Sequence, residues 1–185
     1  MAYLVIACQA MLIGVFAAST ITKVRSRRAY ADFRRSVEAF RVLPPTWSRM
    51  AARATVTGEA AVVLLLALPL TAPIGFALAA GLLCAFTVAI VLALRGGRTA
   101  PCRCFGASAE PLSRTHLIRN LLLLTLSLTG LATGAIRTDP ARDPAGLTLS
   151  LAVAAVAALF VVRFDDVVAL LKPPASDRHH AARRR

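Results

Sequence analysis

The 185-residue sequence has few acidic residues, few aromatic residues and few cysteines. It contains 9 Asp and Glu against 22 Lys and Arg, which gives a formal net charge of +13 at pH 7. Aromatic residues make up only 6% of the chain although 57% of it is hydrophobic, so Leu, Val and Ala fill most apolar positions. The sequence also lacks the regular alternation of polar and apolar positions that a soluble domain needs. Its apolar residues instead come in blocks long enough to span a bilayer.

The four cysteines do not follow the pattern of a secreted disulfide scaffold or of a structural zinc site. Cys8 and Cys84 lie inside apolar runs, where we interpret them as small core residues. Only Cys102 and Cys104 are close to each other in the sequence. Since a structural zinc ion takes four ligands and His116 would add only a third, we predict no metal site.

The excess of positive charge does not indicate a nucleic-acid-binding protein. No recognisable RNA- or DNA-binding module is present, and the Lys and Arg residues flank the apolar blocks. In that position they set the orientation of a membrane protein and bind anionic lipid head groups. We therefore expect the lipid bilayer as a partner and no nucleic acid.

Five apolar runs predict an all-α fold, a polytopic membrane bundle of four to five transmembrane helices. An α-helix rises about 1.5 Å per residue, so roughly 20 residues cross a hydrocarbon core about 30 Å thick. We expect the bundle to occupy residues 1–164, and residues 165–185 to form a basic disordered tail. The predicted spans are residues 2–21, 54–70, 74–94, 115–136 and 146–162.

The basic loop after the first run contains an amphipathic pattern. Its aromatic and apolar residues recur at three- and four-residue steps, which places them on one face of a helix. They are Tyr30, Phe33, Val37 and Phe40. We expect this helix to lie at the membrane interface, and an ordinary solvated loop helix is the alternative.

The distribution of basic residues predicts the orientation of the chain. Nothing basic precedes Tyr3, whereas a cleaved signal peptide carries positive charge before its apolar core, so we expect an uncleaved first helix. The long basic loop, the cysteine loop and the C-terminal tail alternate so that they share one side. The positive-inside rule therefore predicts an outer N-terminus, with the C-terminus and the cysteine loop in the cytoplasm.

Alternating spans bring a set of polar residues to one face of the membrane, whichever face that is. An acid in a span costs up to roughly 2.5–3.5 kcal/mol, so Glu59 should point into the bundle and pair with Lys23 or Arg119. Such a pair could be purely structural or could serve a function. The predicted set is Lys23, Glu59, Cys102, Cys104, His116, Arg119 and Asn120.

Cys102 and Cys104 flank Arg103, whose charge favours the thiolate form of a cysteine. A disulfide needs its Cα atoms within roughly 4.4–6.8 Å, and residues two apart reach that only where the backbone turns. The bond would be strained and easily reduced, which suits thiol–disulfide exchange better than structural cross-linking. His116 could move protons for these thiols. Two ordinary loop thiols are the alternative interpretation.

These residues together resemble the methylamine-utilisation MauE family, which is related to the DoxX-like integral membrane proteins. The similarity covers roughly residues 5–136. The positions that carry it are Lys23, Glu59, the Cys-Arg-Cys-Phe-Gly motif of residues 102–106, and Arg119 with Asn120. The resemblance implies a multi-pass protein of the bacterial inner membrane that helps to mature periplasmic methylamine dehydrogenase, through its disulfides or its export. The family usually has Gly between the two cysteines, so Arg103 departs from its pattern.

We interpret the chain as a thiol–disulfide redox or maturation factor for a partner protein, resembling a thiol–disulfide oxidoreductase and using Cys102 and Cys104. Glu59, Arg119 and His116 would support this pair. A quinone or a thioredoxin-like protein would be its electron partner. The alternatives are a non-catalytic assembly or scaffolding protein and, less favoured, a small transporter, for which no internal repeat is visible. The predicted cytoplasmic thiols are in tension with an oxidising role in the periplasm.

Overall fold

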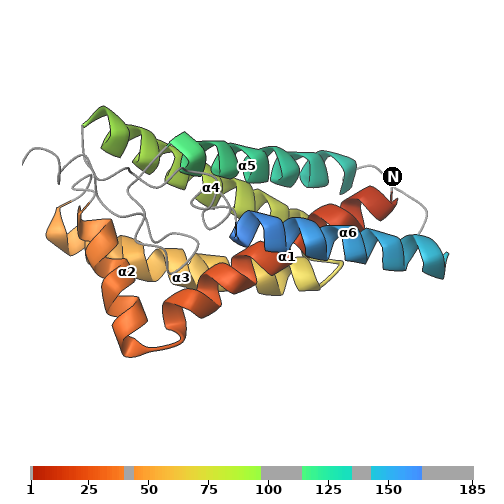
Figure 1. The fold of residues 1–185 in the computed structure, drawn as a ribbon, viewed down its shortest axis with the longest axis horizontal. Helices are drawn as coiled ribbons and strands as arrows, with labels where there is room; N and C mark the ends of the chain where they lie inside the picture. The colour runs from red at the N-terminus through yellow and green to blue at the C-terminus, as the bar shows by residue number, and fades with distance from the viewer. Residues whose placement is uncertain (1, 40–43, 97–113, 135–142, 164–185) are drawn as a thin grey trace, which may run out of the picture.

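Helices make up all the secondary structure of the described residues, which are 2–39, 44–96, 114–134 and 143–163 of the computed structural model. All of them except α2 are long and apolar enough to cross a membrane, which confirms the predicted all-α polytopic fold (Figure 1). The expected tail, residues 165–185, lies outside the described residues, so its boundary stays a prediction. The helices are α1 (Ala2–Val24), α2 (Arg27–Ala39), α3 (Pro45–Ala67), α4 (Ala72–Arg95), α5 (Arg114–Gly134) and α6 (Pro144–Val162).

The second predicted span begins earlier than its apolar run. Helix α3 starts at Pro45 rather than near residue 54, because proline fits the first helical position, where its missing N–H would have no intrahelical partner. Its first turns carry exposed basic residues such as Arg53 and extend the helix beyond the apolar run. The helix ends at Ala67, just before Pro69, since proline disfavours helical backbone in the residue that precedes it.

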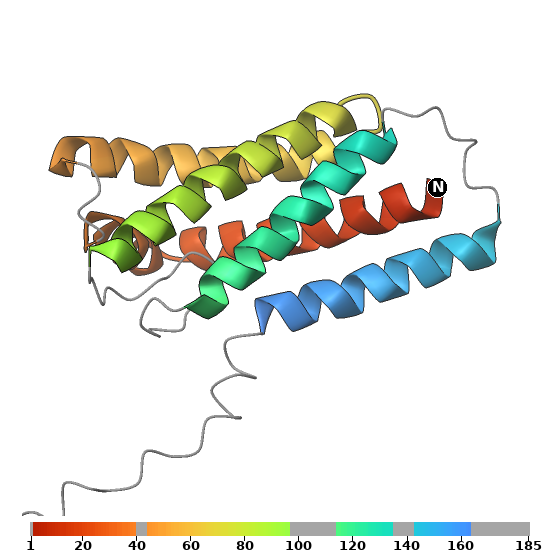
Figure 2. The ribbon, with the colours of Figure 1, turned by 90° about the horizontal axis from the view of Figure 1, so that it is seen from above.

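Helix α1 is the central element of the bundle. It contacts α3, α5 and α6, while α4 packs against α3 and α5 and completes a ring of four helices. Figure 2 shows α6 outside this ring, beside α1. The shared core is built from buried side chains such as Leu12 and Phe16 of α1, Leu66 of α3, Phe76 of α4 and Leu123 of α5.

Helix α6 packs closely on α1. A Cβ atom on Gly14 would lie 3.2 Å from the Cβ atom of Ala158, so the absence of a side chain at Gly14 permits the close approach of the two helices. At the other end of α6 the Asp143 carboxylate accepts hydrogen bonds from the N–H groups of Ala145 and Gly146 and caps the helix. Helix α6 has 19 residues, which is near the minimum length for crossing a membrane, and it includes the fifth predicted run.

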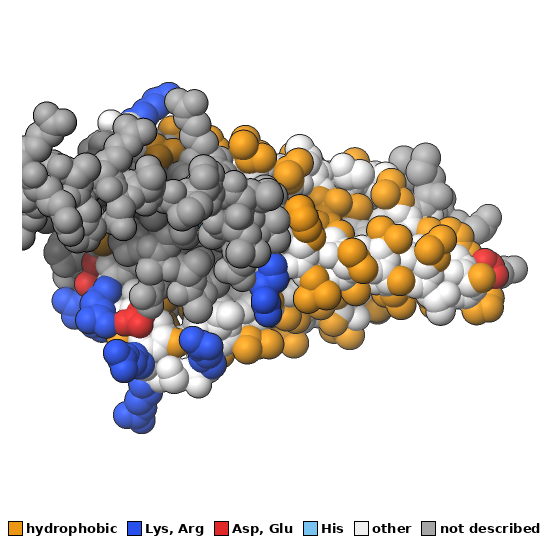
Figure 3. Space-filling view, viewed as in Figure 1, with side chains coloured by type: hydrophobic (Ala, Val, Ile, Leu, Met, Phe, Trp, Pro, Cys, Tyr) orange, Lys and Arg blue, Asp and Glu red, His pale blue; other side chains and the backbone are white. Residues whose placement is uncertain are grey.

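The surface of the bundle is apolar along the helices and basic at one end. Large apolar side chains such as Leu64 and Val156 are exposed, while polar residues such as Glu59, Asn120 and Ser127 are buried. Figure 3 shows the apolar side chains over much of the described surface and basic side chains gathered beside α2. This inside-out distribution is expected of a protein whose solvent is lipid.

Candidate functional site

A buried ion pair joins α1 to α3. The Lys23 Nζ atom lies 2.7 Å and 2.9 Å from the two carboxylate oxygens of Glu59. Ser19 donates a hydrogen bond of 3.1 Å to Glu59 Oε1 and accepts one of 2.5 Å from Lys23. Only 2% of the Lys23 side chain and 0% of the Glu59 side chain are exposed. The three residues form a compact polar group, which we call the α1–α3 cluster.

The helix geometry explains why this cluster forms. Ser19 and Lys23 are four residues apart, so they lie one above the other on the same face of α1. Lys23 lies in the last turn of α1, where the partial negative charge of the helix C-terminus favours a cation. On another face of α3, Gly58 allows close packing against α4, since a Cβ atom there would lie 3.2 Å from a methyl carbon of Leu82.

Helix α2 covers the α1–α3 cluster. The Phe33 ring is buried, and the Lys23 Nζ atom lies 5.0 Å from its centroid, within the range of a cation–π interaction. Ser36, also buried, donates a hydrogen bond to the Phe33 carbonyl oxygen. The predicted amphipathic helix is therefore present, and its apolar face contacts the bundle through Phe33.

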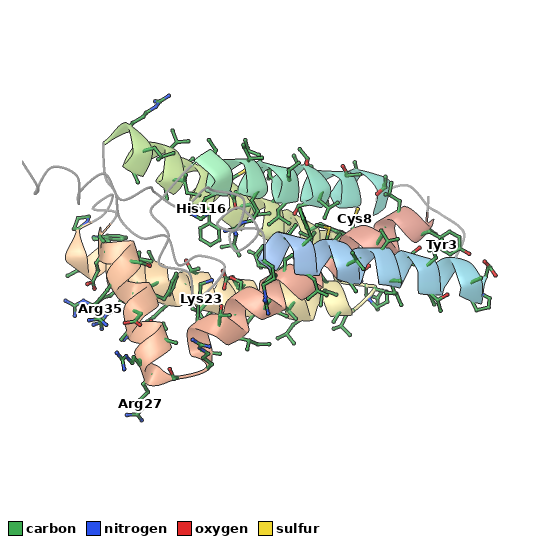
Figure 4. The ribbon with its side chains drawn as sticks, viewed as in Figure 1. Tyr3, Cys8, Lys23, Arg27, Arg35 and His116 are labelled. Atoms are coloured by element: carbon green, nitrogen blue, oxygen red, sulfur yellow. The ribbon has the colours of Figure 1, made fainter. Side chains whose placement is uncertain are left out.

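The polar residues at the start of α5 are buried as well. Asn120 donates hydrogen bonds of 2.7 Å to the Leu83 carbonyl oxygen and 2.6 Å to Thr87 Oγ1, which tie α5 to α4. Its Oδ1 atom accepts no hydrogen bond from a described residue. His116, one turn earlier on the same face, is buried too. In Figure 4, Lys23 and His116 both lie in the half of the bundle beside α2, far from Tyr3.

Arg119 lies on a different side of α5 from Asn120. It lines a pocket of about 340 Å³ between α1, α5 and α6, together with Met11, Leu123 and Phe160. The sequence allowed Lys23 or Arg119 as the partner of Glu59. Among the described residues, Glu59 forms its ion pair with Lys23. We call this second feature the α5–α6 pocket.

The two predicted redox cysteines, Cys102 and Cys104, lie outside the described residues. The helices on either side of them end and begin in the half of the bundle that contains α2: α4 ends at Arg95 and α5 begins at Arg114 there (Figure 2). Cys8 is buried as expected. The interpretation of Cys84 as a core residue was wrong, because its side chain is exposed on the outer face of α4.

Sequence reasoning missed several residues that shape these sites. Ser19 could have been found from its four-residue spacing to Lys23, and Phe33 from its place on the apolar face of α2. Thr87 and the α6 wall of the pocket carry no sequence signal, because they depend on how neighbouring helices are rotated. Within the described ranges, no group of three or more His, Cys, Asp or Glu side chains could hold a metal ion.

Comparison with known proteins gives a consistent match. A family model described as "Methylamine utilisation protein MauE" matches residues 1–133, which cover α1 to nearly the end of α5 and leave out α6. The chain is also similar to the methylamine utilization protein MauE of Paracoccus denitrificans. The two are 38% identical over 137 residues, which is 72% of this chain and 69% of the relative. No solved structure matches the chain.

Proposed function

Because the chain belongs to the MauE family, we propose that it is an integral membrane factor that matures a partner protein by thiol–disulfide exchange. Cys102 and Cys104 form the proposed exchanging pair. The relative is named for methylamine utilization, so the proposed client is a protein of that process. Both cysteines fall within the matched residues 1–133.

The observation that carries the proposal is the position of the α1–α3 cluster. Glu59 and Lys23 are buried in the same half of the bundle where α4 ends and α5 begins. The chain between those two helices contains the Cys-Arg-Cys motif, so its two ends start in the same half of the bundle as the cluster. This arrangement supports the gathering of the two sulfurs and the polar residues at one membrane face.

The proposed exchange conserves atoms and electrons. A client thiolate attacks the Cys102–Cys104 disulfide and forms a mixed disulfide, releasing one cysteine as a thiolate. A second client thiolate then attacks the mixed disulfide, so the client gains a disulfide and the pair becomes two thiols. A quinone or a thioredoxin-like disulfide accepts the two electrons and two protons and restores the pair. Arg103 favours the thiolate form, and His116, Glu59 and Arg119 support the site.

Single and double Cys102→Ser and Cys104→Ser variants test this function. In the full-length protein in membranes, we expect maleimide to modify the pair only after reduction, and every variant to lose client maturation. Cys84→Ser is the matched control, because Cys84 is exposed on α4 and lies in no polar cluster. Free thiols under oxidising conditions, together with full client maturation by the Ser variants, would contradict the proposal.

We also propose that the N-terminus lies outside the cell membrane, and that the C-terminus and the cysteine loop lie in the cytoplasm. The basic side chains beside α2 support this orientation through the positive-inside rule. A membrane-impermeant maleimide applied to intact cells should fail to label Cys102, and should label it once the membrane is permeabilised. Labelling of Cys102 in intact cells would contradict this orientation. It would place the cysteine loop in the periplasm, where an oxidising role is expected.

A non-catalytic assembly role is the second candidate, and the sealed α1–α3 cluster favours it. A fully buried ion pair under a covering helix can hold a bundle together without any chemistry. In that case Glu59→Ala would abolish assembly with the client, and both cysteine substitutions would be silent. Measuring client binding and client maturation separately distinguishes the two roles.

A further inference from the structure

The α5–α6 pocket opens toward the surrounding lipid. Helix α5 crosses over α1, α6 runs alongside α1, and α5 and α6 make little direct contact with each other (Figure 2), so α1 forms the floor of the pocket between them. Leu122 and Phe160 form part of the rim and are 61% and 54% exposed. A ligand can therefore enter sideways from the bilayer without passing through the packed core.

The lining of the pocket is apolar except at Arg119 and at Thr125, whose hydroxyl donates a hydrogen bond to the Leu122 carbonyl oxygen of its own helix. Met11, Leu123, Leu126 and Val161 present hydrocarbon and thioether surface, whereas Arg119 is the one charged side chain among the lining residues that the structure describes. The volume of about 340 Å³ lies within the roughly 300–1,000 Å³ typical of small-molecule sites. The pocket thus has the character of a site for an amphiphile, with a long apolar part and one attachment point for a polar head.

The positive charge of the Arg119 guanidinium group favours a ligand with a negatively charged head group. Arginine stays protonated and presents five N–H donors in a planar fork, which matches the oxygens of a phosphate and leaves donors for a protein partner as well. Arg119 lies in the second turn of α5, so it is near the basic end of the bundle where head groups of one leaflet would lie. Arg163 ends α6 at the same end and is exposed, which adds positive charge near the mouth.

From these observations we propose that the α5–α6 pocket binds an anionic phospholipid. Its acyl chain lies between α1, α5 and α6, and its phosphate accepts hydrogen bonds from Arg119. Charge-assisted hydrogen bonds to phosphate are the strong ones, and they distinguish this site from the general apolar surface that any lipid wets. The proposal does not depend on the thiol chemistry, and its α6 wall lies outside residues 1–133, which the family model matches.

Photo-cross-linking of lipids to the full-length protein in nanodiscs tests the site. The probes are phosphatidylglycerol and phosphatidylcholine that carry the same photoreactive acyl chain, each at the same mole fraction. We expect phosphatidylglycerol to label α5 and α6 around Leu122 and Phe160 several-fold more than phosphatidylcholine does. Equal labelling by the two lipids would overturn the proposal, because it would indicate ordinary boundary lipid.

Substitutions then separate head-group binding from a general charge effect. Arg119→Gln should lower the preference for phosphatidylglycerol on the order of tenfold, because charged hydrogen bonds are lost. Arg95→Gln is the matched control, since Arg95 is exposed at the end of α4 in the same half of the bundle and does not line the pocket. An equal loss of preference in both variants would overturn the proposal.

A second variant keeps the test decisive if Arg119→Gln does not fold. Leu122→Trp fills the mouth of the pocket from an exposed position and should abolish labelling of α6 by phosphatidylglycerol. Leu128→Trp, also exposed on α5 and outside the pocket lining, should leave that labelling unchanged. Undiminished labelling in Leu122→Trp would contradict the site, as would stronger labelling of the same peptides by a photoreactive quinone than by phosphatidylglycerol.

Discussion

The α1–α3 cluster and the α5–α6 pocket place buried charged residues in the same half of the bundle but in different surroundings. In the cluster, Glu59 and Lys23 face each other at hydrogen-bond distance, and Phe33 of α2 covers them. In the pocket, Arg119 lies behind a rim that is open to lipid. The comparison teaches that neighbouring buried charges can have different surroundings, since one is covered by a helix and the other borders a pocket.

The largest expected effect is the loss of one partner in the sealed cluster. Glu59→Ala leaves Lys23 buried without its carboxylate, which should destabilise the bundle by about 3–5 kcal/mol. Denaturant unfolding in detergent micelles, followed by circular dichroism, measures the change. Glu38→Ala is the matched control. It removes a partly exposed ion pair with Arg34 on α2, where the expected loss is at most about 0.5 kcal/mol. Similar losses in the two variants would show that the cluster is not sealed.

A double substitution then tests whether the cluster does more than hold helices. Lys23→Met combined with Glu59→Met replaces the pair with apolar side chains, and we expect the stability of the double variant to return close to that of the parent protein. Client maturation should still be lost if Glu59 supports the cysteines. A folded double variant with full maturation activity would assign the pair a structural role only.

The next effect concerns the cover on the cluster. Phe33→Ala removes a buried ring and its contact with Lys23, and we expect a loss of roughly 2–4 kcal/mol, near or below the range for buried aromatic residues because α2 can shift. A Ser19→Cys reporter should be protected from a water-soluble maleimide in the parent protein and become reactive with Phe33→Ala. Phe33→Leu should keep most of the protection. A reporter that reacts equally in all three backgrounds would mean that α2 does not close the cluster.

The smallest expected effect is in the hydrogen bonds that join α5 to α4. Asn120→Ala removes the bonds to Leu83 and Thr87, and interhelical hydrogen bonds in membranes contribute about 0.6–1.7 kcal/mol. The same unfolding assay should show a loss of about 1 kcal/mol. Thr129→Ala on the same helix should change little, because the Thr129 hydroxyl bonds only its own helix at Thr125 and is exposed. A loss above about 3 kcal/mol for Asn120→Ala would contradict this prediction, because it would equal the loss expected from breaking the buried ion pair.

Much of this architecture could be predicted from the sequence. Runs of apolar residues predict the five spans, because a bilayer selects segments of one length and polarity. Alternation of the spans then predicts that Lys23 and Glu59 lie near one membrane face, and the cost of a carboxylate in lipid predicts that Glu59 is paired. The amphipathic pattern of α2 also follows from its spacing alone.

The rest depends on the rotation of each helix about its axis. In lipid, an apolar side chain has a similar free energy inside the bundle and on its lipid-facing surface. Hydrophobicity therefore does not distinguish the two faces of a helix. For this reason Cys84 was assigned to the core and lies instead on the outer surface. The choice of Lys23 over Arg119 as the partner of Glu59 has the same origin, since both cations come from the same end of the bundle.

The sequence by itself determined which segments enter the membrane and which charged residues share a leaflet, because both follow from transfer free energy and from counting helices. Only the tertiary structure decided which charge is sealed and which borders a pocket. Both features depend on close packing between helices. Gly14 allows α6 to approach α1, and Phe33 packs α2 over the ion pair. The shapes of side chains on neighbouring helices determine how the helices pack, and this packing cannot be read from the pattern of residues along a single helix.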